Sequence, residues 1–224
     1  MRPGPTRRPR KRPAPVVSLP PLPAHPTVSV ALATYNGARY LQEQLDSIAR
    51  QTHLPGELVV GDDGSTDATL EILERFAQTA PFPVHVQSNP TRLGFGRNFL
   101  ATLARRRGDI LFLSDQDDVW FEHKVATVVE AFQRDDTVGT LTHDSMLTDA
   151  SLRPTGERTL GPAADVGRDL HMAHGAALAI RSDFLARTPP PGPSFTSHDG
   201  HMALTAGLLG LYGVLPRSAD ARPP

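Results

Sequence analysis

The chain has 224 residues, of which 39% are hydrophobic and 21% charged, which is typical of a soluble globular protein with one core. It contains no cysteine, which excludes disulfide bonds, thiolate metal sites and cysteine nucleophiles. The net charge is only −1 but is uneven, because six basic residues and no acid lie within the first 12 positions.

The first 26 residues are rich in proline and arginine and poor in large apolar side chains, so we expect a disordered tail there. They lack the apolar core of about 7 to 15 residues that a secretion signal needs. A basic tail could contact anionic lipid, so peripheral membrane contact is one expectation and an unstructured start without function is the other. Nowhere does the chain reach the roughly 20 apolar residues of a membrane-spanning helix, and residues 202–215 are better explained as a buried helix.

From residue 27 onward, short β-rich runs alternate with segments of helical periodicity, which predicts an α/β fold with a mostly parallel sheet between helices. We expect strands at residues 28–34, 57–61, 84–87 and 109–114, and helices at 38–51, after the turn at 62–67 as far as 77, and at 96–107. The second half is less regular, with a helix at 122–133, a strand at 138–142, a polar loop at 144–169, an apolar segment at 175–180 and a helix at 198–212. Residues 216–224 read as disorder, which leaves 27–215 as the single domain.

Two acidic clusters follow strands in this scheme. Asp62 and Asp63 come after the second strand, and Asp115, Asp117 and Asp118 after the fourth. In open parallel sheets, ligands bind beyond the carboxyl ends of the strands, so both clusters should share one edge. Ligand sets made only of oxygen favour Mg²⁺ or Mn²⁺, and such an ion could hold phosphate. The alternatives are a solvated Asp-x-Asp turn and, for residues 62–67, a helix N-cap that binds nothing.

Four motifs together carry a resemblance to a known family. They are Ala33 to Asn36 with Tyr40-Leu41, the run Asp-Asp-Gly-Ser-Thr-Asp at 62–67, the run from Asn89 to Asn98, and Ser-Asp-Gln-Asp-Asp-Val-Trp at 114–120. In order and spacing this chain resembles family 2 glycosyltransferases of the GT-A type, and most of all their bacterial rhamnosyltransferase-like members. The resemblance implies a nucleotide-diphospho-sugar donor, a saccharide or lipid-linked acceptor, Mn²⁺ or Mg²⁺, and cell-surface polysaccharide synthesis with inversion at the anomeric carbon. It also implies a cytoplasmic location, at most at the inner face of the membrane, and no nucleic-acid partner.

The same resemblance assigns roles to single residues. Asp117 would bind the metal, and Asp115 would bind it through water or hold the donor ribose. Asp199 would be the catalytic base, because an alcohol acceptor needs deprotonation near neutral pH. The other donor contacts would be Thr34, Tyr35, Asn36, Asp62, Asp63, Arg97 and Asn98, and the acceptor side would be formed by His174, Gly175 and His198.

Several alternatives remain open from the sequence. Tyr35 could be a core residue, Arg92 a second cation or a surface residue, and Trp120 a sugar platform or, as we favour, a brace for the acidic turn. Members of the resembled group continue beyond the last helix with a further strand and a segment carrying Tyr-Arg and His, which this chain lacks. A catalytically inactive nucleotide-sugar-binding remnant is therefore the second hypothesis. A nucleotidyltransferase is disfavoured, because Tyr35 to Ala38 is not a glycine-rich basic loop.

Overall fold

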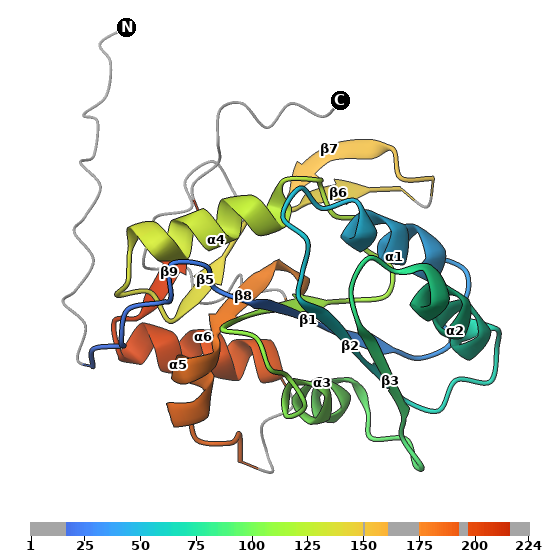
Figure 1. The fold of residues 1–224 in the computed structure, drawn as a ribbon, viewed down its shortest axis with the longest axis horizontal. Helices are drawn as coiled ribbons and strands as arrows, with labels where there is room; N and C mark the ends of the chain where they lie inside the picture. The colour runs from blue at the N-terminus through green and yellow to red at the C-terminus, as the bar shows by residue number, and fades with distance from the viewer. Residues whose placement is uncertain (1–16, 150, 161–174, 193–196, 216–224) are drawn as a thin grey trace, which may run out of the picture.

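The computed structural model describes residues 17–149, 151–160, 175–192 and 197–215 (Figure 1). The strands are β1 (Val28–Thr34), β2 (Glu57–Asp62), β3 (Val84–Ser88), β4 (Ile110–Ser114), β5 (Thr140–Thr142), β6 (Met146–Thr148), β7 (Pro154–Arg158), β8 (Leu178–Arg181) and β9 (Tyr212–Val214). The helices are α1 (Leu41–Ala49), α2 (Thr69–Thr79), α3 (Phe95–Leu103), α4 (Lys124–Arg134), α5 (Ser182–Arg187) and α6 (His198–Leu208), with a 3₁₀ turn η2 (Gly175–Ala177).

A seven-stranded sheet in the order β3-β2-β1-β4-β8-β5-β9 forms the centre of the fold. Strands β3, β2, β1 and β4 are parallel, whereas β8 is antiparallel to both β4 and β5. Helices α1, α2 and α4 cover one face and α3, α5 and α6 the other (Figure 1). Every residue of β1, β2 and β4 is buried, as expected for strands covered on both faces. The predicted α/β fold with a mostly parallel mixed sheet is confirmed.

The loop predicted at residues 144–169 is wrong in part, because it contains the antiparallel hairpin β6–β7. Asp144 fixes its base by accepting from Leu160 N at 2.9 Å and pairing with Arg158 at 2.5 Å. The two strands are short and mostly exposed, so they show no apolar alternation that would reveal them.

The helix predicted at residues 198–212 also ends too late. Helix α6 stops at Leu208, and Gly210 takes a φ of +72°, a left-handed conformation that commonly ends helices. The following residues form β9, which pairs in parallel with β5. The apolar run 202–215 is therefore half helix and half strand. None of the described helices is both long and apolar enough to cross a membrane.

Part of the expected disordered tail packs onto the domain. Leu19 is 9% exposed and joins the apolar cluster on the α3 and α6 face. Pro20 O accepts a hydrogen bond from the buried Arg181, and Ala24 O accepts one from Gln133 at 2.9 Å. The expectation of a tail as far as residue 26 is thus wrong for residues 17–26, and its remaining part lies outside the described residues.

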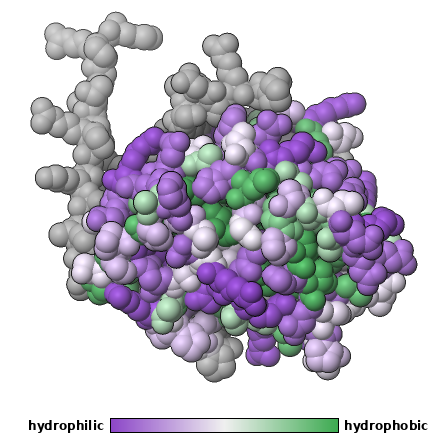
Figure 2. Space-filling view, in the orientation of Figure 1, coloured by the Kyte–Doolittle hydropathy of each residue, from purple (hydrophilic) through white to green (hydrophobic). Residues whose placement is uncertain are grey.

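Hydrophilic residues cover most of the face shown in Figure 2, with smaller hydrophobic areas between them. The large apolar side chains that are exposed come from separate elements, including Phe95 on α3, Leu208 on α6 and Leu152 between β6 and β7.

Candidate functional site

The carboxyl ends of β1, β2 and β4 meet at one edge of the sheet. In the strand register Thr34 lies opposite Asp62, and Leu32 lies opposite Ser114. The two acidic clusters therefore follow the strands on either side of β1, at the same edge of the sheet, as the sequence predicts.

Asp62 is a brace for the loop that follows β2. It is fully buried and accepts hydrogen bonds from Thr34 Oγ1 at 3.0 Å, Ser65 N at 3.0 Å, Gly64 N at 3.2 Å and Ser88 Oγ at 3.2 Å. Both Asp62 and Thr34 are predicted donor contacts, but their polar atoms are directed at each other and at this loop.

Asp63 ties the loop before α3 to the end of β2. It is 3% exposed and accepts from Leu93 N at 2.7 Å, Gly94 N at 2.8 Å and Asn89 Nδ2 at 3.1 Å. Burial alone would raise the pKa of Asp63, but these hydrogen bonds and the charge of Arg92 outweigh it, so the pKa is lowered. The carboxylate is ionised and fixes the loop geometry.

Asn98 is a third residue with a bracing role. It is 2% exposed, donates to Gly61 O at 2.7 Å and accepts from Asn89 at 2.9 Å. A Cβ on Gly61 would lie 2.6 Å from Asn98 Oδ1, so glycine allows α3 to approach β2 closely. Its neighbour Arg97 is exposed at the start of α3.

Tyr35 and Arg92 form the open part of this edge. Tyr35 is 37% exposed, so it is not a core residue, and the Arg92 guanidinium lies 3.8 Å from its ring centroid. Gln116 holds the Tyr35 backbone from the acidic loop, accepting at 2.8 Å and donating at 3.2 Å. Asn36 is turned away, since its Oδ1 accepts from Thr66 N at 2.8 Å. An exposed ring beside a guanidinium suits a base and a phosphate.

The acids after β4 have different surroundings. Asp117 is exposed, whereas Asp115 Oδ1 and Asp118 Oδ2 are buried oxygens without a hydrogen-bond partner. Burial, followed by the charges of Asp118, Asp117 and Asp199, raises the pKa of Asp115 to about 7. Burial also raises the pKa of Asp118. Two desolvated carboxylate oxygens without a partner destabilise the folded protein unless a cation binds to them.

Lys124, at the start of α4, is a site residue that the sequence reasoning missed. Its Nζ donates to Ala176 O at 3.0 Å and lies 3.8 Å from the ring centroid of Trp120. Burial lowers the pKa of Lys124 to about 7, although the nearby Asp118 and Asp115 act in the opposite direction. The available signal was its position, four residues after the only tryptophan of the chain.

Gln44 of α1 contacts residues at both ends of the acidic loop. In the amide orientation that satisfies both ends, it accepts from Ser114 Oγ at 2.5 Å and Trp120 Nε1 at 3.2 Å, and its nitrogen faces Asp118 O. Trp120 is 5% exposed and packs against Phe112 with ring centroids 5.6 Å apart. This burial supports the interpretation of Trp120 as a brace.

The N-terminus of α6 faces the acidic loop. Burial would raise the pKa of Asp199, but hydrogen bonds from Ser197 and Gly200 and the neighbouring His198 lower it overall. A Cβ on Gly175 would lie 3.2 Å from His198 Nε2 and 3.7 Å from Asp199 Oδ2. Gly175, His198 and Asp199 are thus brought together, whereas His174 lies outside the described residues.

His198 itself is enclosed by aromatic rings. It is 2% exposed, stacks on Phe99 with centroids 4.5 Å apart, and meets Phe95 edge-on at 5.2 Å. Neither ring nitrogen has a hydrogen-bond partner, and burial lowers the pKa of His198. This packing fixes the first residue of α6, which directly precedes Asp199.

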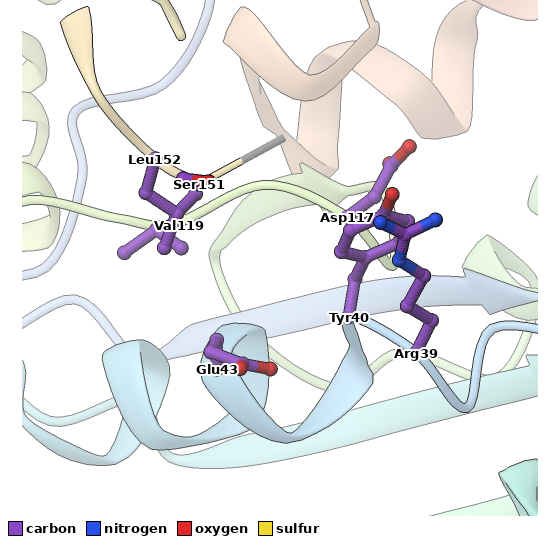
Figure 3. A pocket seen from close by; sticks show the side chains of 7 residues that line it. All are labelled: Arg39, Tyr40, Glu43, Asp117, Val119, Ser151 and Leu152. Carbon is purple, nitrogen blue, oxygen red and sulfur yellow. The ribbon is translucent and has the colours of Figure 1, made fainter. Parts of the chain in front are cut away.

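A pocket of about 240 Å³ opens beside Asp117 (Figure 3). Arg39 and Tyr40 lie with Asp117 at one end, while Ser151 and Leu152, from the turn between β6 and β7, lie with Val119 at the other. Glu43 of α1 completes the lining. Of these residues only Asp117 was a predicted site residue, and Ser151 and Leu152 come from a hairpin that the sequence did not reveal.

The family model for glycosyl transferase family 2 matches residues 29–185, which includes both acidic clusters. The chain belongs to glycosyl transferase family 2. Its similarity to curated family members lies within a restricted region. It is 38% identical over 118 residues to an uncharacterized glycosyltransferase of Nostoc sp., covering 52% of this chain and 36% of that protein. It is 33% identical over 103 residues to a dTDP-rhamnosyl transferase of Shigella flexneri, covering 44% and 36%. The chain thus matches about a third of the length of these relatives.

Solved structures share the GT-A fold. The S. aureus TarS fragment in complex with UDP superposes with a TM-score of 0.69 at 23% identity, covering 86% of this chain and 59% of that one. A mannosyltransferase from Pyrobaculum calidifontis, in complex with GDP-Man and Mn²⁺, gives a TM-score of 0.62 at 23% identity, covering 91% and 61%. These similarities establish the fold of the family 2 domain.

The acidic loop fits a divalent cation whose remaining ligands are phosphate oxygens and water. Within the described ranges, no three His, Asp or Glu side chains form a metal site on their own. Mg²⁺-type sites for nucleotides often use only one or two carboxylates together with phosphate oxygens and water. The two unpaired oxygens of Asp115 and Asp118, with Asp117 beside them, match that smaller donor set.

Proposed function

We propose that this domain transfers a sugar, with inversion, from a nucleotide-diphospho-sugar to a saccharide or lipid-linked acceptor in cell-surface polysaccharide synthesis. The observation that carries the proposal is the pair of buried, unpaired carboxylate oxygens after β4. The charge of Asp199 contributes to the raised pKa of Asp115, after burial, Asp118 and Asp117. Family membership supports the reaction type, and the residues of the sheet edge support its assignment to a nucleotide donor.

The donor nucleotide would bind along the carboxyl ends of β1 and β2. Tyr35 would stack on the base, and Arg92 and Arg97 would contact the diphosphate. Asp63 remains the proposed acceptor for a base N–H, while Thr34, Asn36, Asp62 and Asn98 would hold the loops in place. Similarity to a dTDP-rhamnosyl transferase makes a dTDP-linked deoxysugar the first donor to test.

The leaving nucleoside diphosphate develops negative charge that must be stabilised. Asp117 and Asp115 are the proposed ligands of Mn²⁺ or Mg²⁺, and the unpaired oxygen of Asp118 makes it a third candidate. The bound ion would supply Lewis-acid stabilisation of the diphosphate. Gln116 and Gln44 keep the acidic loop in register with β1 and α1.

Asp199 would accept the proton of the acceptor hydroxyl. Its lowered pKa keeps it ionised at neutral pH, and Gly200 N, donating to Oδ1 at 2.8 Å, orients the carboxylate. Gly175 leaves room beside Oδ2, so the acceptor can approach from the side of η2.

Donor binding and transfer should separate in two variants. Asp117→Ala should abolish Mn²⁺-dependent transfer and weaken nucleoside diphosphate binding, whereas Asp199→Ala should lose transfer by at least about 100-fold while keeping donor affinity. Binding is measured by calorimetry with dTDP or UDP and Mn²⁺, and transfer by release of nucleoside diphosphate. The exposed Asp136→Asn is the matched control. Unchanged turnover in both variants would contradict the proposal, and binding without any transfer by the wild type would favour an inactive binding module.

A further inference from the structure

Lys124 stands out by composition as well as by position. The only other lysine is Lys11, and all remaining basic residues except histidines are arginines. A chain that uses arginine nearly everywhere has a lysine beside its acidic loop. Lysine carries a compact ammonium on a flexible stem, whereas the arginine guanidinium is a planar fork that demands several acceptors. Lysine therefore suits a place where a compact cation meets few hydrogen-bond acceptors.

The contacts of Lys124 join two parts of the site. Its Nζ donates to Ala176 O of η2 at 3.0 Å, and its ammonium lies over the ring of Trp120 at 3.8 Å. Trp120 is in turn fixed by its backbone N–H, which donates to Ser47 Oγ at 3.0 Å. The Lys124 side chain thus connects the acidic loop with the turn that contains Gly175.

The charge of Lys124 attracts Asp115 and Asp118, but among the described residues Lys124 forms no ion pair with either carboxylate. Asp115 Oδ1 and Asp118 Oδ2 remain without hydrogen-bond partners. An ammonium in this place balances negative charge and leaves those oxygens available to a second cation.

We propose that Lys124 is a positioning residue that serves as the resident cation of the acidic loop. It offsets the repulsion of Asp115 and Asp118 while no metal is bound, and it opposes a divalent ion when one enters. The metal is then held loosely enough to leave with the nucleoside diphosphate. The identity of the second cation rests on the proposed function, but the charge balance without metal does not.

The first test removes the charge and measures Mn²⁺ binding without nucleotide. Lys124→Met should bind Mn²⁺ about tenfold more tightly than wild type, because one opposing positive charge is gone. Its melting temperature should fall by several degrees without metal and recover toward the wild-type value in saturating Mn²⁺. Lys124→Arg keeps the charge and should bind Mn²⁺ no more tightly than wild type.

Arg105→Met is the matched control. Arg105 is another part-buried cation, donating to Val60 O at 3.0 Å from the end of α3, and its loss should lower the melting temperature without changing Mn²⁺ affinity. A purely structural role for Lys124 would give the same pattern as this control. Equal or weaker Mn²⁺ binding by Lys124→Met would overturn the proposal.

Two further variants decide cases in which the first test gives no answer. Lys124→Gln retains a donor for Ala176 O, so it replaces the methionine variant if that protein does not fold. Lys124→Gln combined with Asp118→Asn should be more stable without metal than Lys124→Gln alone, since the repulsion is relieved. If wild type binds no Mn²⁺, the metal part of the proposed function fails, while this double variant still decides the role of Lys124. A double variant no more stable than the single one would overturn that role.

Discussion

Single residues of the same type have opposite roles at this sheet edge. Both carboxylate oxygens of Asp62 accept hydrogen bonds, from the ends of β1 and β3 and from the loop after β2, whereas Asp115 and Asp118 each keep a buried oxygen without a partner. A saturated carboxylate stabilises the fold, and an unsaturated one is prepared for a ligand. We therefore propose a structural role for Asp62 and a ligand-binding role for Asp115 and Asp118, although both clusters follow strands.

Asp62→Asn tests this distinction. The amide cannot accept all the hydrogen bonds of the carboxylate, so we expect the free energy of unfolding to fall by about 2 kcal/mol or more. Nucleoside diphosphate affinity of the folded fraction should stay within about twofold of wild type. Urea unfolding and calorimetry provide the two readings, with Asp46→Asn as control, because the half-buried Asp46 of α1 accepts its side-chain hydrogen bond from Gln42 of the same helix. Wild-type stability combined with lost binding would show that Asp62 contacts the donor.

Candidate site residues within a continuous motif can be proposed from the sequence, whereas those contributed by distant segments cannot. Asp115, Asp117 and Asp199 lie in short motifs that indicate metal binding or acid–base chemistry. Gln44 acts on Ser114 from 70 positions earlier, and nothing in its own segment indicates that contact. Lys124 likewise gains its role from Ala176, 52 positions later in the chain.

At the level of elements, the sequence pattern identifies the strands that are buried on both faces of the sheet. The parallel strands β1, β2 and β4 are continuous apolar runs and lie where the sequence places them. Strand β9 has three residues and forms only through pairing with β5, so a local pattern could not separate it from the helix before it. The hairpin β6–β7 depends in the same way on Asp144, outside both strands.

The turn between β6 and β7 contains a strained leucine. Leu152 has a φ of +60° and is 47% exposed beside the pocket. Because a left-handed conformation costs a non-glycine residue about 1–2 kcal/mol, Leu152→Gly should be neutral or stabilising. Ser151→Gly, one position earlier and without a positive φ, should lower the free energy of unfolding, leaving a difference of about 1 kcal/mol between the two variants. Equal destabilisation would mean that packing of Leu152 in the pocket offsets its strain.

Over the whole molecule, the free energy of unfolding should depend on pH through titratable groups that are buried in their neutral form. His143 follows β5, and its Nε2 is buried without a partner. Burial, assisted by the charge of Lys124, lowers the pKa of His143 to about 3, despite the hydrogen bond with Asp144 O at 3.1 Å. Above about pH 6.5, His143 is neutral in both folded and unfolded chains, so its contribution to stability is fully present. Between about pH 6.5 and pH 3, only the unfolded chain binds the proton, and stability is lost as the pH falls.

His143→Gln isolates this contribution, because glutamine does not titrate. The free energy of unfolding of wild type, relative to this variant, should fall by about 2 kcal/mol between pH 7 and pH 5. Asp115 acts in the opposite direction, since its pKa of about 7 lets the folded chain keep a proton that the unfolded chain releases above about pH 4. Both proteins share Asp115, so its effect cancels in the comparison. Urea unfolding at pH 7, 6 and 5 gives the difference, with the exposed His25→Gln as control. A difference that does not change with pH would mean that His143 has the same pKa in the folded and unfolded chains, so that burial does not keep it neutral.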